Sequence, residues 1–218
     1  YFLWTLTQKQ LAHCLFPIGE YVKPDVRAIA RRAGLPTADK KDSQGICFLG
    51  KVSVADFLKQ YIPEKRGVAL NVSGEKIGEH AGVSFYTIGQ RHIAISNIKY
   101  QKSKIPGNPK PIYVAEKNIE TNTLVVAEGD TNPALYRKEI ELTNTNFINP
   151  LHSLIRANRR IDVFARVRYR QPLAKAYIMH HESGVKLVFE KPQKFVAPGQ
   201  SAVFYNKARE LLGGGIIA

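Results

Sequence analysis

Cysteine is scarce in this sequence, since Cys14 and Cys47 are the two cysteines among 218 residues. Two cysteines build no disulfide framework and, by themselves, no zinc site. Such sparing use is typical of proteins of the reducing cytoplasm. The first ten residues also lack the basic start and the long apolar stretch of a signal peptide. The sequence therefore predicts a cytoplasmic protein.

Signals of other functional classes are also missing. No apolar run approaches the roughly 20 residues that span a bilayer, so we expect no membrane partner. None of the six histidines has ligand spacing with a second histidine or a cysteine, so no metal site is predicted. Gly213–Gly215 have no helix predicted after them, and the sequence has no glycine-rich nucleotide-binding motif. We expect no cofactor site within this chain.

Negative charge is in short supply. The chain has 18 acidic residues against 32 lysines and arginines, which gives a net charge of +14. A surplus of this size favours a polyanionic partner, either nucleic acid or an anionic membrane surface. The sequence has no basic amphipathic helix long enough to favour the membrane, so nucleic acid is the leading partner. On charge alone, the alternative is a basic protein that binds no polyanion.

The first part of the chain has a helical pattern. Thr7 can cap a helix that runs to about Leu15. Pro24 suits the first turn of a second helix, which ends before Gly34. Ser53 can cap a third helix. Residues 1–65 are therefore predicted to form a helical part.

From Gly67 onward the apolar residues alternate with a period of two, which indicates short strands. We expect strands at 67–72, 75–80, 83–88, 111–117, 123–129, 138–144, 162–170, 174–181, 185–191, 201–206 and 214–218. Several short strands at regular spacing are typical of a small barrel or sandwich. We therefore predict an α+β chain with a small β-rich domain at 66–133 and a C-terminal antiparallel β-barrel at 134–218.

Cys47 is the candidate nucleophile. Two lysines precede it and glycines flank it within Lys40–Gly50. A nearby cation favours the reactive thiolate, and glycines can expose the sulfur on a loop. The alternative is a small buried apolar side chain, since free cysteine is among the most buried residue types. Cys14 has apolar neighbours in a predicted helix, so we expect it to pack in the core.

The basic segment Ile161–Arg170 is the candidate nucleic-acid-binding surface. In an extended strand, alternation places Arg166, Arg168 and Arg170 on one face, where they could bind phosphates. Tyr169 falls on the other face and could stack on a base or pack in the core. The alternative is a solvated strand face without a ligand.

Four segments, taken in order, resemble one family. They are residues 1–50, HAGVSFYTIGQRHIA at 80–94, RVRYRQP at 166–172, and APGQSAVFYN at 197–206 followed by LGGGIIA. All four are similar to the tRNA-specific 2-thiouridylases (the MnmA family). The resemblance covers essentially the whole chain. It implies that the helical part is a remnant of an α/β PP-loop domain and that the barrel resembles domain 2 of elongation factor Tu.

The resemblance also implies a function. These enzymes use ATP to adenylate the C2 oxygen of the wobble uridine at position 34 of tRNA, and a cysteine persulfide then delivers sulfur to that carbon. Cys47 stands at the persulfide position of the family's Asp-Ser-x-Gly-Ile-Cys-Phe pattern. Arg168, Tyr169 and Gln200 stand at its tRNA-contacting positions. A sulfur-relay donor protein is implied as a further partner.

Some of the family pattern has no counterpart in this chain. The family's second cysteine, which pairs transiently with the persulfide cysteine, and its ATP-holding Ser-Gly-Gly-x-Asp-Ser loop both lie upstream of the matching region. We therefore expect a C-terminal piece that is inactive alone. After Gly89–Arg91 the family commonly has several glycines, whereas this chain has His92–Asn97. The alternative function is a non-catalytic RNA-binding barrel in which Cys47 is structural.

Overall fold

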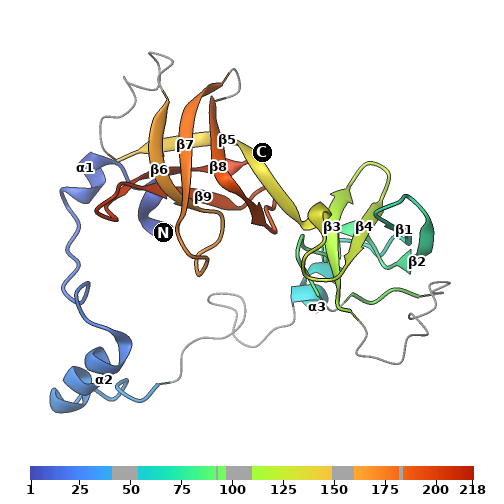
Figure 1. Ribbon diagram of the computed structural model, residues 1–218. Coiled ribbons are helices and arrows are strands. Elements are labelled where there is room, and N and C mark those ends of the chain that lie inside the picture. Colours follow the sequence, from blue (N-terminus) through green and yellow to red (C-terminus); the bar gives the residue numbers. More distant parts are fainter. Residues whose placement is uncertain (41–53, 92, 97–109, 149–159, 182–183) are drawn as a thin grey trace. The chain divides into compact units, whose positions relative to one another are not determined.

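The computed structural model describes residues 1–40, 54–91, 93–96, 110–148, 160–181 and 184–218 (Figure 1). These residues form two compact units. One unit joins Tyr1–Gln8 to Glu64–Ala218, and the other is Lys9–Pro63. Short helices, a four-stranded sheet and a closed six-stranded barrel confirm the predicted α+β class.

Helices account for the regular structure near the start of the chain. They are α1 (Gln8–Leu11), α2 (Lys23–Arg32) and α3 (Val54–Lys59). Pro24 lies in the first turn of α2, where its missing N–H costs nothing. Gly34 follows the helix with φ +67°, a left-handed conformation that glycine adopts without strain. The predicted second helix is therefore confirmed.

The predicted first helix is shorter than expected, because α1 ends at Leu11 and is followed by a turn. Among the described residues of Lys9–Pro63, Ala38 alone is buried. Leu15, Ile18 and Ile29 are among the apolar residues of this part that are exposed. The predicted helix cap Ser53 lies outside the described residues.

A small sheet follows, with strand order β2-β1-β4-β3. Its strands are β1 (Gly67–Asn71), β2 (Lys76–His80), β3 (Ile112–Asn118) and β4 (Thr123–Glu128). The β1–β2 and β3–β4 pairs are antiparallel, and β1 runs parallel to β4. These strands and the β3–β4 hairpin agree with the period-two pattern.

Residues 83–88 do not form the predicted strand. Val83–Phe85 is a 3₁₀ helix, η2, and Val83 and Tyr86 are both buried in the core of the small sheet. In a 3₁₀ turn, positions i and i+3 lie on the same side, which a strand would not allow. The Tyr86 hydroxyl donates to the carbonyl of Ala94 (2.9 Å) and so fixes the segment after the Gly89 turn.

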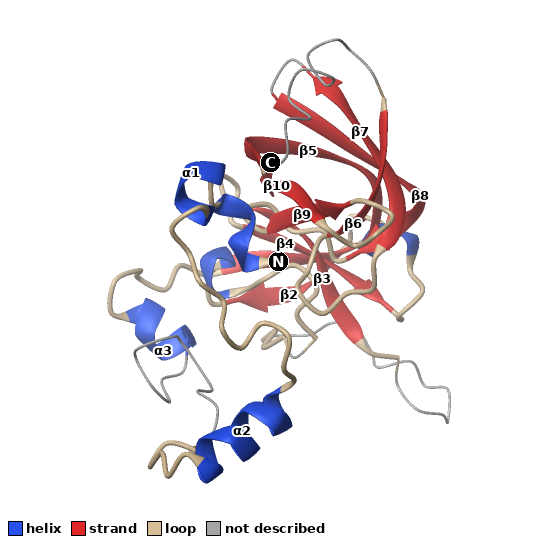
Figure 2. Ribbon diagram, turned by 90° about the vertical axis from the view of Figure 1, so that its left-hand side faces the viewer, coloured by secondary structure: helices blue, strands red, loops and turns tan. Residues whose placement is uncertain are grey.

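The closed barrel has strand order β10-β5-β8-β7-β6-β9 (Figure 2). Its strands are β5 (Tyr136–Phe147), β6 (Ile161–Arg166), β7 (Ala174–His181), β8 (Gly184–Lys194), β9 (Ser201–Tyr205) and β10 (Leu211–Ile217). All of its strand pairs are antiparallel. The predicted C-terminal antiparallel barrel is confirmed. Closure leaves no unpaired edge strand.

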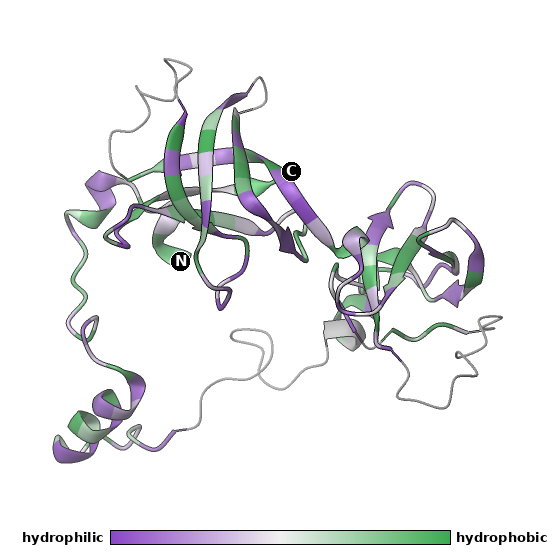
Figure 3. Cartoon of the chain, in the orientation of Figure 1, coloured by the Kyte–Doolittle hydropathy of each residue, from purple (hydrophilic) through white to green (hydrophobic). Residues whose placement is uncertain are grey.

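Alternating side chains fill the interior of the barrel. Hydrophobic and hydrophilic residues follow one another along its strands (Figure 3). The largest fully buried side chains include Leu142, Ile178, Leu187, Phe189 and Phe204. Burial of each such side chain contributes about 1.5–3 kcal/mol, so this core holds the barrel surface in place.

The first residues of the chain pack on the barrel. Trp4, in the 3₁₀ helix η1 (Phe2–Thr5), is 6% exposed and packs against Val203 and Tyr205. Its indole N–H donates to the hydroxyl of Ser201 (3.0 Å). A Cβ at Gly214 would lie 2.8 Å from the indole ring, so glycine is required there for close approach.

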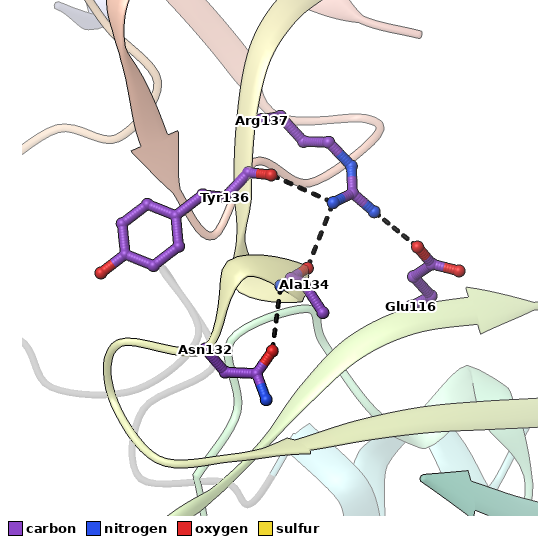
Figure 4. A network of polar contacts seen from close by, with 5 residues as sticks. All are labelled: Glu116, Asn132, Ala134, Tyr136 and Arg137. Atoms are coloured by element: carbon purple, nitrogen blue, oxygen red, sulfur yellow. Dashed lines mark hydrogen bonds and ion pairs between the residues drawn. The ribbon is translucent and has the colours of Figure 1, made fainter. Parts of the chain in front are cut away.

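A polar network joins β5 to β3 (Figure 4). Arg137 pairs with Glu116 at 2.5 Å and donates to the carbonyls of Ala134 and Tyr136, both at 3.1 Å. The side chain of Asn132 accepts from the backbone N–H of Ala134 (3.0 Å) and so caps η3 (Pro133–Leu135). The ion pair is exposed, so it contributes little stability and mainly orders this connection.

Candidate nucleic-acid interface

The structure describes one of the two cysteines, Cys14. Cys47 lies outside the described residues, so its predicted role stays a prediction. Cys14 is free and half-buried, and its thiol donates to the carbonyl of Gln10 (3.2 Å). It lies in a turn after α1 and belongs to none of the buried apolar clusters formed by the described residues. The expectation that Cys14 packs in a core is therefore wrong.

The basic strand is shorter than predicted. β6 ends at Arg166, and a turn begins two residues later, where the N–H of Gln171 donates to the carbonyl of Arg168 (3.1 Å). The chain must turn here because β7 begins at Ala174 and pairs with β6 from Ala165 backwards. The prediction of three arginines on one strand face is therefore wrong for the residues after Arg166.

Arg166 is held in a defined place at the end of β6. Its Nη1 donates to the carbonyl of Tyr169 (2.8 Å), and its guanidinium lies 5.1 Å from the ring centroid of Tyr205. Its Nε is buried and has no hydrogen-bond partner among the described residues. Burial raises the pKa of the Tyr205 hydroxyl, and the charge of Arg166 opposes that rise. The phenol therefore stays neutral at neutral pH beside a fixed cation.

Arg168 turns into the protein. It is half-buried, with Nη2 donating to the carbonyl of Ile88 (2.7 Å) and Nε to the carbonyl of Phe195 (3.2 Å). Burial lowers the pKa of this guanidinium below its ordinary value. Ile88 directly precedes Gly89, whose φ is +83° and where a Cβ would lie 2.6 Å from the ring of Phe195. Arg168 thus bonds to the residue that precedes the Gly89–Arg91 segment, a contact that the sequence did not reveal.

Arg170 lines a cleft on the barrel together with Arg166. The cleft has a volume of about 660 Å³. We call it the barrel cleft, and define it by its lining residues Phe164, Arg166, Arg170, Gln171, Pro172, Leu173, Tyr205, Lys207 and Arg209. Four of these residues are cationic and none is acidic. The arrangement can bind an anion, because like charges that line one cleft repel each other until an anion lies among them.

Sequence reasoning missed Lys207 and Arg209, which lie in the turn between β9 and β10. Antiparallel pairing of β6 with β9, in which Phe164 lies opposite Tyr205, brings this turn to the barrel cleft. Two cations directly after a predicted strand were a visible signal. The sequence did not reveal which strands pair, so the two basic segments remained unconnected.

Tyr169 is 52% exposed, rather than packed in the core. Its ring centroid lies 4.9 Å from that of Phe2 and 5.8 Å from that of Tyr1. The Tyr1 hydroxyl donates to the carbonyl of Ser201 (2.6 Å), the residue after the exposed Gln200. Tyr1 therefore contacts both Tyr169 and the residue that follows Gln200. Exposed rings beside cations can stack on nucleic-acid bases.

Among the described residues, no group of three or more histidine, cysteine or acidic residues could hold a metal ion. No helix among these residues has both the length and the apolar character that crossing a membrane requires.

Three family models match the chain in succession. Residues 1–51 match the tRNA methyl transferase HUP domain, residues 55–128 the tRNA methyl transferase PRC-barrel domain, and residues 137–217 the aminomethyltransferase beta-barrel domain. The boundary between the last two models falls close to the transition from the small sheet to the barrel.

Curated relatives match over the whole chain. The tRNA-specific 2-thiouridylase MnmA of Pseudomonas putida (strain W619) is 42% identical over 218 residues, which are 100% of this chain and 55% of the relative. The corresponding proteins of Hahella chejuensis and Pseudomonas aeruginosa (strain LESB58) are 41% and 40% identical over 100% of this chain, which covers 57% and 55% of them. The chain thus spans about half the length of the curated relatives it matches.

Proposed function

Since the chain belongs to the family of tRNA-specific 2-thiouridylases, we propose that it acts in the ATP-dependent 2-thiolation of wobble uridine 34 in tRNA. The observation that carries this proposal is the 42% identity over all 218 residues to a protein of that name. The net charge of +14 and the four cations of the barrel cleft support a polyanionic substrate. Exposed Tyr169, beside the cleft, supports contact with bases.

Cys47 carries the sulfur in this proposal. Its local pattern Asp-Ser-Gln-Gly-Ile-Cys-Phe agrees with the family's persulfide position. The outer sulfur of the Cys47 persulfide attacks C2 of the adenylated uridine, and AMP leaves. The family's second cysteine, upstream of the matching region, then attacks the Cys47 sulfur of the resulting S–S bond, so that 2-thiouridine is released and a disulfide between the two cysteines forms. Reduction of this disulfide by a thiol frees Cys47, and a sulfur-relay donor protein restores the persulfide. The neighbouring lysines favour the thiolate, which is the form that accepts sulfur from a donor.

ATP belongs to the proposed reaction, but the described residues of the HUP match do not fit an ATP site. A phosphate-binding loop of this kind is glycine-rich and joins a strand to the first turn of a helix. In residues 1–40 there are two glycines, Gly19 and Gly34, and no strand. α2 follows a turn, and its first turn contains Pro24. We propose that ATP binds in the part of the relatives that this chain does not match.

Substitution of Cys47 tests the sulfur role. In the full-length enzyme, we expect Cys47→Ser to abolish 2-thiouridine while tRNA binding persists, because serine occupies nearly the same volume but cannot carry sulfane sulfur. Cys14→Ser is the matched control and should leave the product unchanged. Mass spectrometry of nucleosides from the reacted tRNA measures the product and separates 2-thiouridine from a methylated uridine.

Two outcomes of that measurement would decide against the proposal. Normal 2-thiouridine from the Cys47→Ser enzyme would eliminate the persulfide role and favour a structural Cys47. A methylated nucleoside in place of 2-thiouridine would favour methyl transfer, the reaction that two of the matched family models name. The alternative of a non-catalytic RNA-binding barrel predicts tRNA binding with neither product.

A further inference from the structure

The turn between β9 and β10 is fixed by bonds that leave its cations free to bind a ligand. The side-chain oxygen of Asn206 accepts from the N–H of Glu210 (2.9 Å), and its amide donates to the Glu210 carboxylate (2.5 Å). The N–H of Arg209 donates to the carbonyl of Asn206 (3.0 Å). The acid of this turn is thus engaged by Asn206, while the side chains of Lys207 and Arg209 are exposed.

The segment that carries Arg166 and Arg170, which also lines the barrel cleft, is likewise held by hydrogen bonds. Arg166 is held by the carbonyl of Tyr169 and lies beside the ring of Tyr205. Gln171 accepts from the N–H of Val167 (3.3 Å) and donates to the side chain of Gln193 (2.9 Å). These bonds fix the segment that carries Arg170. The cleft is therefore preformed, and little ordering is needed before an anion binds.

No carboxylate neutralises the cleft in the described part of the chain. Among these residues, Arg170, Lys207 and Arg209 form no ion pair, whereas Lys186 and Lys194 pair with Glu139 and Asp130 on other faces of the same unit. The cations therefore repel one another in the free protein. An anion with several oxygens would relieve this repulsion.

The apolar lining residues indicate the kind of anion. Phe164, Leu173 and Tyr205 line the same cleft as the four cations. Its volume of about 660 Å³ exceeds what a single phosphate needs and falls in the range of small-molecule sites. A sugar attached to the phosphate could pack on these apolar side chains, and the next base could reach the exposed rings of Tyr169 and Phe2.

We propose that the barrel cleft binds a backbone phosphate of tRNA, with Lys207 and Arg209 as phosphate contacts alongside Arg166 and Arg170. This inference rests on the proposed function, because it takes tRNA as the substrate. It adds the β9–β10 turn to the tRNA-binding surface. That surface then includes residues from the segment after β6 and from the turn after β9.

Salt-dependent binding tests the cleft. The probe is an in vitro transcript of a tRNA with uridine at position 34, and the full-length protein is titrated by fluorescence anisotropy at several salt concentrations. The test variant is Lys207→Gln with Arg209→Gln. We expect affinity to fall roughly fivefold for each lost contact at about 0.15 M salt, and the log–log salt slope to decrease by roughly one for each.

The matched control removes the same charge elsewhere on the barrel. Lys138 in β5 and Lys191 in β8 are exposed and do not line the cleft. Lys138→Gln with Lys191→Gln should leave both affinity and salt slope within error. Equal losses in the two double variants would show an effect of net charge and overturn the cleft proposal. An unchanged salt slope in the Lys207–Arg209 double variant would overturn it as well.

A second arm separates backbone phosphate from free phosphate. Inorganic phosphate is titrated into the wild-type protein and the cleft variant by calorimetry. Phosphate binding that is lost in the variant, together with unchanged tRNA binding, would assign the cleft to the free ion and overturn the RNA assignment. If the wild-type protein does not bind tRNA at all, the proposed function fails with it. If the wild-type protein binds tRNA and the Lys207→Gln, Arg209→Gln variant binds it with the same affinity and salt slope, the cleft inference alone fails.

Discussion

Arg168 and Arg170 lie two positions apart and face different surroundings. Arg168 is half-buried and donates to the carbonyls of Ile88 and Phe195. Arg170 is exposed on the barrel cleft. We expect Arg168→Gln to lower the free energy of unfolding by about 1–3 kcal/mol, because charge-assisted bonds to two partly buried carbonyls are lost and partial exposure reduces the strength of these bonds. Urea denaturation measures the change.

The same substitution at Arg170 is the control for stability. Arg170→Gln should change the free energy of unfolding by less than about 0.5 kcal/mol, as is usual for an exposed residue, while it weakens tRNA binding. Equal stability losses in the two variants would contradict the distinction. An Arg168→Gln protein as stable as wild type would show that the two hydrogen bonds from Arg168 to backbone carbonyls do not stabilise the fold.

The arginines also show how far residue patterns reach. Alternation in an extended strand places Val163, Ala165 and Val167 on the face opposite Arg166, and all three are buried. Tyr169 would share that face, but it is 52% exposed, because strand alternation holds only while the ladder continues and β6 ends at Arg166. The hydropathy pattern indicates which positions of a strand point inward. The residue at which the strand ends depends instead on where the strands paired with it end.

At the scale of elements, local signals predicted strands more reliably than contacts between them. The strand predicted at 174–181 is Ala174–His181, since its alternating pattern is complete within the segment. Residues 83–88 have strand-forming side chains, yet Val83 and Tyr86 share one core and require a 3₁₀ turn. The barrel cleft was missed for a related reason. Lys207 and Arg166 line the same cleft only through the pairing of two strands far apart in sequence.

The short element η1 offers a test of how the first residues support the binding surface. Trp4 is 6% exposed, packs on Val203 and Tyr205, and donates to Ser201. We expect Trp4→Ala to lower the free energy of unfolding by about 3–5 kcal/mol, the usual cost of removing a buried aromatic side chain. Chemical denaturation measures the change in the free energy of unfolding, with far-UV circular dichroism as a signal that does not depend on tryptophan.

Phe2 provides the control on the same element, because its side chain is 69% exposed. Phe2→Ala should leave stability nearly unchanged, since little buried area is lost. It should still weaken tRNA binding if its ring, 4.9 Å from that of Tyr169, helps to stack a base. A Trp4→Ala protein as stable as wild type would contradict the inference that the Trp4 indole anchors η1 on the barrel.

At the scale of the whole molecule, the proposed function assigns recognition and chemistry to different parts of the sequence. The barrel supplies the cationic cleft and the exposed rings. Cys47 lies in the range that matches the HUP domain. The described residues of that range do not fit an ATP site, and the chain covers 55% of its relative from Pseudomonas putida. Binding should therefore be separable from catalysis.

This separation predicts the behaviour of the 218-residue chain. Incubated with tRNA, ATP and a sulfur donor, it should bind tRNA in a salt-dependent way and yield no 2-thiouridine, because uridine C2 is not activated without ATP chemistry. Anisotropy measures the binding, and nucleoside mass spectrometry measures the product. The full-length enzyme is the positive control in both assays. Robust 2-thiouridine from the chain alone would show that its own residues activate the uridine, and the proposed division of labour would then be wrong.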